Sequence, residues 1–240
     1  MNKRGRIIVI EGTDCSGKET QTDMMVARMD KEGIPYGTLS FPRYDTPTGR
    51  IVGQCYLGKE RRSQSHQPWP GDRAWFGDPN KVGPKIACLY YAADRLAALP
   101  EIFSMLNSGR NLVLNRYVES NMGHQAGKKK TSRERTDIVR YIDDLEYGIL
   151  GLPKPDAVIF LYVPYKIGMR LKKGRPEKAD GHESNPQHLK NAERAYLELV
   201  RSRGWIQINC IENGKMRERE DIHEEVFDCL KNFHFFNNEK

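Results

Sequence analysis

The sequence has no long hydrophobic run. Its longest apolar stretches are Ile7 to Ile10 and Ala157 to Val163, whereas a membrane-spanning helix needs about 20 apolar residues. Three of the first six residues are basic, but the apolar segment after them is too short for a signal peptide. We therefore expect no membrane association and a cytoplasmic location.

Paired cysteines, repeats and low-complexity tracts are also missing. The five cysteines are odd in number, widely spread and without a CxxC spacing, so the sequence predicts neither a disulfide framework nor a zinc site. Reduced thiols agree with a cytoplasmic protein.

The composition is typical of one globular domain. Of the 240 residues, 38% are hydrophobic and 30% are charged, which is enough apolar material for a core. At about 150 residues per domain, the chain is expected to form a single domain over residues 1–240. The net charge of +7 indicates either a nucleic-acid or membrane surface or a site for a small anion.

Short apolar segments alternate with longer segments of helical periodicity. Continuous apolar runs are typical of parallel strands covered on both faces, so the pattern predicts an α/β fold with a mainly parallel five-stranded sheet flanked by helices. Functional residues are expected at the carboxyl ends of the strands. The predicted strands are 6–10, 36–41, 111–114, 157–163 and 206–211; the predicted helices are 18–32, 83–107, 135–147, 185–203 and 224–236.

Two irregular segments interrupt this alternation. Residues 59–84 combine prolines, glycines, tryptophans and basic residues and are a predicted insertion, either a cap over a pocket or a surface elaboration. Residues 172–186 mix Gly, Pro, Lys, Arg and His and are a predicted lid. Loops of this length inside a domain are usually functional or mobile.

The most informative motif follows the first strand. Gly12 and Gly17-Lys18 match GxxxxGK between a strand and a helix, the context of a phosphate-binding loop (P-loop). Its backbone N–H groups and the helix N-terminus hold polyphosphate, and the lysine adds a compact cation. The residues predicted to bind ATP here are Gly12, Thr13, Asp14, Cys15, Ser16, Gly17, Lys18, Glu19 and Thr20. This motif alone fits kinases, GTPases, motor ATPases and helicases.

Further polar and aromatic residues follow later elements. Tyr91 and Arg95 are four residues apart on a predicted helix, so they share a face and could stack on a base and bind its edge. Read in isolation, such a pair is more often a core tyrosine and a surface arginine. The third strand ends in Asn115-Arg116-Tyr117.

Six motifs in order resemble the thymidylate kinase family: EGTDCSGK, FPRY with Gly49, YYAADR, NRY followed by SNMGHQAGK, GLPKPD, and a basic loop leading into AERAYLEL. The resemblance implies a P-loop NTPase fold and transfer of the γ-phosphate of ATP to dTMP, with Mg²⁺, giving dTDP for dTTP biosynthesis. It also implies small nucleotide substrates and a homodimer, with no nucleic acid and no membrane partner.

The resemblance assigns roles to individual residues. Asp14 corresponds to the residue that binds the 3′-hydroxyl, Tyr91 to the ring that stacks on thymine, and Arg95 to the arginine at the base edge. Arg116 lies between the donor and acceptor phosphates, and basic lid residues assist. The full implied sets are Lys18, Arg116 and Arg175 for catalysis; Arg170 for ATP; and Asp14, Phe41, Arg43, Tyr91, Arg95, Arg116, Ser120, Asn121 and Gln125 for the acceptor.

The chain departs from the family pattern at three positions. Glu19 replaces the hydroxyl residue that normally ligates Mg²⁺, and Asn115 replaces an aspartate, so Glu19, Thr20 and Asn115 are the predicted metal residues. We hypothesise that Glu19 compensates for the neutral Asn115. Tyr44 occupies the usual place of a phosphate-clamping arginine, so Arg43 is the predicted clamp.

These departures leave alternatives open. One is a P-loop kinase with another nucleotide or nucleoside as acceptor, and another is an ATP-binding homologue with little or no kinase activity. Nucleic-acid binding is disfavoured, because the basic residues cluster in the lid, in the insertion and at residues 128–130.

Overall fold

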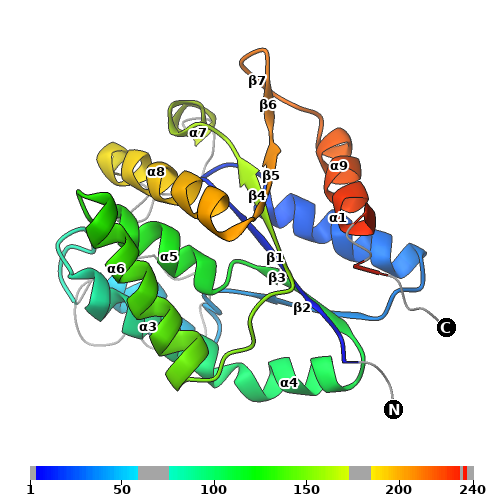
Figure 1. Cartoon of the computed structure of the whole chain (residues 1–240), viewed down its shortest axis with the longest axis horizontal. Coiled ribbons are helices and arrows are strands. Elements are labelled where there is room, and N and C mark those ends of the chain that lie inside the picture. The colour runs from blue at the N-terminus through cyan, green and yellow to red at the C-terminus, as the bar shows by residue number, and fades with distance from the viewer. Residues whose placement is uncertain (1–3, 59–75, 173–184, 233–234, 237–240) are drawn as a thin grey trace.

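The computed structural model describes residues 4–58, 76–172, 185–232 and 235–236. Its centre is a five-stranded parallel sheet in the order β2-β3-β1-β4-β5 (Figure 1). This arrangement confirms the predicted α/β fold. The strands are β1 (Ile7–Gly12), β2 (Tyr36–Ser40), β3 (Asn111–Asn115), β4 (Ala157–Tyr162) and β5 (Ile206–Asn209).

Helices cover both faces of this sheet (Figure 1). α1 and α9 lie on one side, and α3, α5, α6 and α8 lie on the other. The helices are α1 (Lys18–Lys31), α2 (Pro47–Arg50), α3 (Pro84–Ala97), α4 (Leu99–Asn107), α5 (Val118–Gly127), α6 (Ser132–Ile142), α7 (Tyr165–Lys172), α8 (Pro186–Arg203) and α9 (Arg219–Asn232), with π-helical turns η1 (Ile51–Tyr56) and η2 (Asp143–Ile149).

The central strand β1 divides the core into two layers. Ile7 and Val9 join a cluster with residues of α4, α5 and α8, whereas Ile8 and Ile10 pack against α1 and α9. Successive side chains of a strand point to opposite faces. A strand covered on both sides therefore has to be apolar at every core position, which is why its sequence is continuous rather than alternating.

All five predicted strands are present, with small differences at their ends. The clearest is at the last strand, which ends at Asn209 rather than Ile211. Ile211–Glu212 (β6) instead pairs with Lys215–Met216 (β7) as an antiparallel hairpin. Asn213 and Gly214, both at positive φ, form its turn, because a tight hairpin turn needs left-handed residues.

The helix predictions needed more correction. The expected helix 83–107 is two helices, α3 and α4, because Pro100 has no N–H and its ring would clash with the carbonyl four residues earlier. The expected helix 135–147 begins earlier, with Thr131 and Glu134 forming a capping box. The terminal helix begins at Arg219 and ends at Asn232. Helices α2, α5 and α7 were not predicted.

Most of the predicted insertion and lid lies outside the described residues. At the C-terminal end of the insertion, Phe76 stacks on Tyr90 with ring centroids 4.5 Å apart. The Lys128 amine donates to the carbonyls of Pro79 (2.8 Å) and Val82 (3.0 Å). These contacts fix this end of the segment against α3 and α5.

None of the helices in the described ranges is long and apolar enough to cross a membrane. All five cysteines are free thiols, as the absence of paired spacings predicts.

The packing of α5 on α8 positions much of the site, and it depends on Gly123. A Cβ added to Gly123 would lie 2.3 Å from Cζ of the buried Tyr196 ring. We expect Gly123→Ala to lower the free energy of unfolding by about 1–3 kcal/mol, as overpacking does in a filled core. Urea unfolding measures this. Gly148→Ala is the matched control, because its nearest neighbour is 3.9 Å away, and an equal loss there would contradict the argument.

Candidate active site

The P-loop is held between the ends of β1 and β4. Thr13 Oγ1 donates to the Val163 carbonyl (2.7 Å) and accepts from the Val163 N–H (2.9 Å). A Cβ on Gly12 would lie 2.5 Å from the Leu161 carbonyl oxygen, and Gly17 has a φ of 82°. Both positions therefore require glycine, one for close backbone approach and one for a left-handed conformation.

Lys18 is folded back onto its own loop. Its Nζ donates to the carbonyls of Gly12 (3.0 Å) and Thr13 (2.8 Å), and the side chain is buried. Burial, with the nearby charge of Arg116, lowers the pKa of Lys18 to about 8, although Asp14 and Glu11 oppose this shift. At neutral pH the lysine is therefore mostly protonated. An anion bound in the loop would stabilise this positive charge.

Arg116 connects the P-loop to the end of β3. It has a φ of 65°, which is uncommon for a residue other than glycine. Its guanidinium lies 3.5 Å from Glu11 Oε1 and 3.9 Å from Asp14 Oδ1, with 26% of the side chain exposed. Burial alone would lower the pKa of Arg116, but the carboxylates of Glu11 and Asp14 raise it above its ordinary value.

An open cavity of about 660 Å³ lies beside this loop. Its walls come from the end of β2, from α3 and from α5, so it joins residues that are far apart in sequence. The predicted acceptor residues that line it are Asp14, Phe41, Tyr91, Arg95, Arg116, Ser120, Asn121 and Gln125; the lining also includes Pro42, Tyr44, Leu57, Tyr117, His124 and Leu189.

A buried ion pair organises the wall of this cavity. Arg95 is 1% exposed and binds Glu146 with two bonds, Nε to Oε2 (2.5 Å) and one terminal nitrogen to Oε1 (2.7 Å). Its other terminal nitrogen donates to the Tyr117 carbonyl at 3.2 Å. Because a guanidinium carries five N–H donors, two remain for a ligand. Glu146 also accepts from Asn121 Nδ2 at 2.8 Å.

The polar atoms of the cavity are not all satisfied. Both amide atoms of Gln125 and the Oδ1 atom of Asn121 are buried without a hydrogen-bond partner among the described residues. Buried polar atoms normally have partners, and leaving one unpaired costs about 1–3 kcal/mol. These atoms are therefore the part of the cavity wall that a polar ligand would complement.

Arg43 differs from the other predicted acceptor residues, because it does not line the cavity. Its backbone N–H donates to Asp94 Oδ2 (2.8 Å), and its guanidinium lies 3.5 Å from both Asp94 Oδ1 and Glu101 Oε2. Tyr44, the next residue, lines the cavity instead. The motif predicted correctly that this loop lies beside the cavity. Which of its side chains enters the cavity depends on contacts with residues of α3 and α4.

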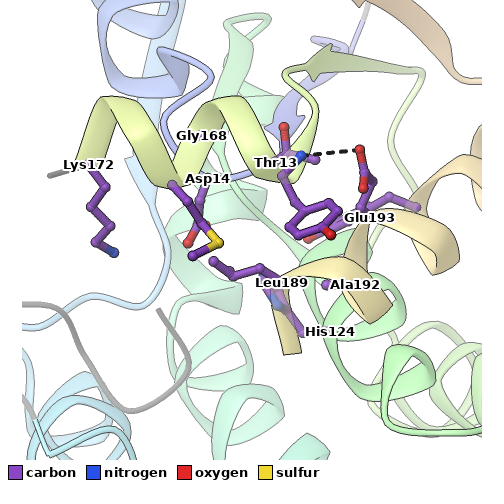
Figure 2. Close-up of a pocket in the computed structure, with 11 residues that line it drawn as sticks. Thr13, Asp14, His124, Gly168, Lys172, Leu189, Ala192 and Glu193 are labelled. Carbon is purple, nitrogen blue, oxygen red and sulfur yellow. Dashed lines mark hydrogen bonds between the residues drawn. The ribbon is translucent and has the colours of Figure 1, made fainter. Parts of the chain in front are cut away.

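A second, smaller cavity of about 390 Å³ lies between the P-loop, α7 and α8. Figure 2 shows Thr13 and Asp14 on one side and Lys172 of α7 at its edge. Asp14 and His124 line both cavities, so the two spaces meet at the P-loop. Of the two cavities, only the larger is also lined by Arg116.

Comparison with known proteins gives one consistent result. A family model described as thymidylate kinase matches residues 10–226. The chain belongs to the thymidylate kinase family. It is 26% identical over 232 residues to thymidylate kinase of Halothermothrix orenii, covering 95% of this chain and 97% of that protein. It is also 26% identical to human thymidylate kinase, covering 93% and 89%.

Solved structures agree on the fold. A thymidylate kinase structure from Candida albicans superposes with a TM-score of 0.70 at 20% identity, covering 98% of this chain and 94% of that one. Members of this family are nucleoside monophosphate kinases. The predicted family, the P-loop NTPase fold and the phosphotransferase class are thus confirmed.

The residues predicted to hold metal lie in two places. Glu19 and Thr20 are exposed on the first turn of α1, whereas Asn115 ends β3. Among the described residues, Asn115 Oδ1, Asp14 Oδ2 and Ser16 Oγ are buried without hydrogen-bond partners. Oxygen atoms of this kind suit a hard divalent cation. Arg170 is exposed near the end of α7, and Arg175 lies outside the described residues.

Sequence reasoning did not single out several residues of the site. Tyr117 and His124 line the 660 Å³ cavity, called the acceptor cavity below because it contains most of the predicted acceptor residues, and Glu11 contacts Arg116. All three stand inside motifs that were recognised, so proximity to a motif was the available signal. What the sequence could not indicate was which of these side chains turn inward.

We expect ATP binding to the free enzyme to weaken as pH rises through 8. Only protonated Lys18 pairs with phosphate, and with a pKa of about 8 the protonated fraction falls from about nine tenths at pH 7 to about one tenth at pH 9. The dissociation constant should rise about tenfold over this range. Calorimetry at pH 8.5 in two buffers of different ionisation enthalpy should show proton uptake. Binding without proton uptake would contradict this assignment.

Proposed function

We propose that the chain transfers the γ-phosphate of ATP to dTMP. The observation that carries the proposal is the cavity beside the P-loop, which is lined by the aromatic ring of Tyr91, by the unpaired amide of Gln125 and by the unpaired Oδ1 atom of Asn121. Family membership supports the same reaction. We place this activity in the cytoplasm, since all five thiols are free.

The chemistry of the cavity favours a pyrimidine of the thymine type. Such a base offers an N–H donor between two carbonyl acceptors, and a primary amide can complement both kinds of group. Gln125 supplies an unpaired acceptor and an unpaired donor, and Arg95 retains two N–H donors. The Tyr91 ring supplies a flat face on which the base can stack.

Phosphoryl transfer needs alignment and neutralisation of charge more than covalent help. Lys18 can leave its two carbonyl partners for the donor phosphates, and Arg116 lies where donor and acceptor phosphates would meet. Because the acceptor phosphate is already ionised, no strong general base is needed. Asp14, which lines both cavities, is the proposed partner of the acceptor sugar.

We propose that the reaction uses Mg²⁺, which neutralises phosphate charge when bound. Its support is that Ser16 Oγ and Asn115 Oδ1 are buried without hydrogen-bond partners among the described residues, and oxygen atoms are the ligands that Mg²⁺ takes. Glu19 is exposed beside the loop and could bind the ion through water. Arg170, near the end of α7, and Lys172, the first residue of the predicted lid, would add positive charge for the ATP phosphates. The predicted role of Arg175 falls outside the described residues.

An acceptor panel tests the activity directly. We expect ADP release with dTMP to exceed that with dCMP or dGMP by at least about tenfold, because only a thymine-type base matches the amide and guanidinium groups of the cavity. Thymidine should also be a poor acceptor, because it has the matching base but no ionised phosphate to accept the γ-phosphoryl group. Tyr91→Ala should raise the KM for dTMP more than the KM for ATP. A coupled ADP-release assay measures both quantities.

Three outcomes would contradict parts of the proposal. Preference for another acceptor would support a kinase of different specificity, and ATP binding without ADP release would support a homologue with little activity. Titrating Mg²⁺ in Glu19→Gln tests the metal residue: we expect a higher half-saturating Mg²⁺ concentration. An unchanged titration would remove Glu19 from the metal site.

We also propose that the chain forms a homodimer through α3. Ile86, Leu89 and Leu96 are 53%, 48% and 40% exposed, and their spacing places them on one face with the exposed Ala93. An exposed apolar stripe on a helix is typical of a surface that a partner covers. A second copy presents the same stripe, which suits a symmetric interface.

Leu89→Glu should dissociate this dimer, because it would bury two unpaired carboxylates at the interface. Light scattering coupled to size-exclusion chromatography measures the mass. Leu171→Glu is the control, since Leu171 is 38% exposed on α7, away from α3 (Figure 1). A monomeric wild-type chain, or equal dissociation by both variants, would contradict the proposal.

A further inference from the structure

Glu11 is a charged residue inside the core strand of the sheet. It is 0% exposed and belongs to β1, whose other members are apolar or glycine. Isolated burial of a carboxylate is very costly, so a buried charge is normally paired and hydrogen-bonded. An apolar residue would fill the same position in the strand without the free-energy cost of burying a charge. Folding alone therefore does not explain why a glutamate stands here.

Among the described residues, the hydrogen bonds and the ion pair of this carboxylate join it to residues of the active site. Oε1 accepts from the Gly12 N–H at 3.0 Å and lies 3.5 Å from the Arg116 guanidinium. Oε2 accepts a hydrogen bond from the Ser120 hydroxyl. The P-loop, the end of β3 and the start of α5 thus meet at one buried side chain.

Glu11 does not line either cavity, whereas Arg116 and Ser120 line the acceptor cavity. The carboxylate therefore contacts Arg116 from the protein side while part of the guanidinium, with 26% of the side chain exposed, stays open to a ligand. Asp14 lies farther away, at 3.9 Å, and is itself a cavity residue. Of the two carboxylates paired with Arg116 in the described part of the chain, Glu11 is the one that holds the arginine without lining the cavity.

We propose that Glu11 is a positioning residue that holds Arg116 and Ser120 in the geometry needed for phosphoryl transfer. The proposal rests on the proposed function. A fixed guanidinium stabilises charge that develops in the transition state without having to reorganise. Without the Glu11 charge, the Arg116 side chain would be free to turn toward Asp14 or solvent. The cost should therefore appear in kcat rather than in substrate affinity.

The first test is Glu11→Gln, which keeps the size of the side chain and removes its charge. We expect kcat for dTMP phosphorylation to fall about 10- to 100-fold, the cost of a displacement near 1 Å, while the dissociation constants of ATP and dTMP change less than about threefold. Glu11→Asp retains the charge but retracts it by about 1.5 Å, and we expect an intermediate kcat. Unchanged kcat in both variants would overturn the proposal.

A double-mutant cycle separates positioning from structural support. Arg116→Ala alone should lower kcat by about 1000-fold, as for other arginines that stabilise transferring phosphate. If Glu11 acts mainly through Arg116, Glu11→Gln should lower kcat much less in the Arg116→Ala background than in the wild type, the remainder reflecting Ser120. Added guanidinium ion should partly restore Arg116→Ala and should fail to restore the double variant. Losses that multiply, or equal rescue of both, would overturn the proposal.

Glu119→Gln is the matched control. Glu119 is also buried near Glu11, but it accepts from the Tyr147 hydroxyl at 2.6 Å and does not contact Arg116. Burial raises the pKa of Glu119 to about 7, so the amide resembles the protonated form. We expect kcat within about threefold of wild type, and a loss as large as that of Glu11→Gln would overturn the specific role of Glu11. If the wild-type chain itself showed no turnover, the proposed function would be contradicted, and not the role of Glu11. The dissociation constants of ATP and dTMP then show whether the substrates still bind.

Discussion

The parallel pairing of β1 with β3 and β4 is the constraint on which every other feature of the site depends. Its register places Ile10 beside Asn115 and Gly12 beside Leu161, so the P-loop and Arg116 emerge at the same edge of the sheet. Parallel strands end together, which is why binding residues gather there. Because β1 is buried on both faces, a slip in register would move apolar side chains out of their layers.

Buried ion pairs then give the site its rigidity. Glu146 holds Arg95 and Asn121, and Glu11 contacts Arg116 and Ser120. Such pairs add little net stability, because desolvation offsets most of their attraction, but losing one partner is strongly destabilising. Their value for a kinase is preorganised charge beside a cavity that binds anions.

The sequence was most informative where structure is local. Apolar and β-branched runs located all five strands, most clearly β1, β3 and β4, because a strand covered on both faces is apolar at most of its positions. The helix predictions failed at two places. Pro100 divides one expected helix into two. Helix α5 was missed because its residues are polar and glycine-rich, and it is buried mainly by its packing against α8. The roles of individual site residues stay predictions, although most of those residues do line one cavity.

The sequence by itself determined the P-loop, because that loop needs particular residues at fixed spacing along a short piece of chain. Glycine at positions 12 and 17 meets local backbone requirements that no distant neighbour can replace. Only the tertiary structure decided that Arg43 turns to Asp94, that Tyr44 lines the cavity, and that Glu11 faces Arg116. Each of these outcomes depends on a partner from another element, 51 residues away for Arg43 and Asp94, and side-chain direction is set where such elements pack.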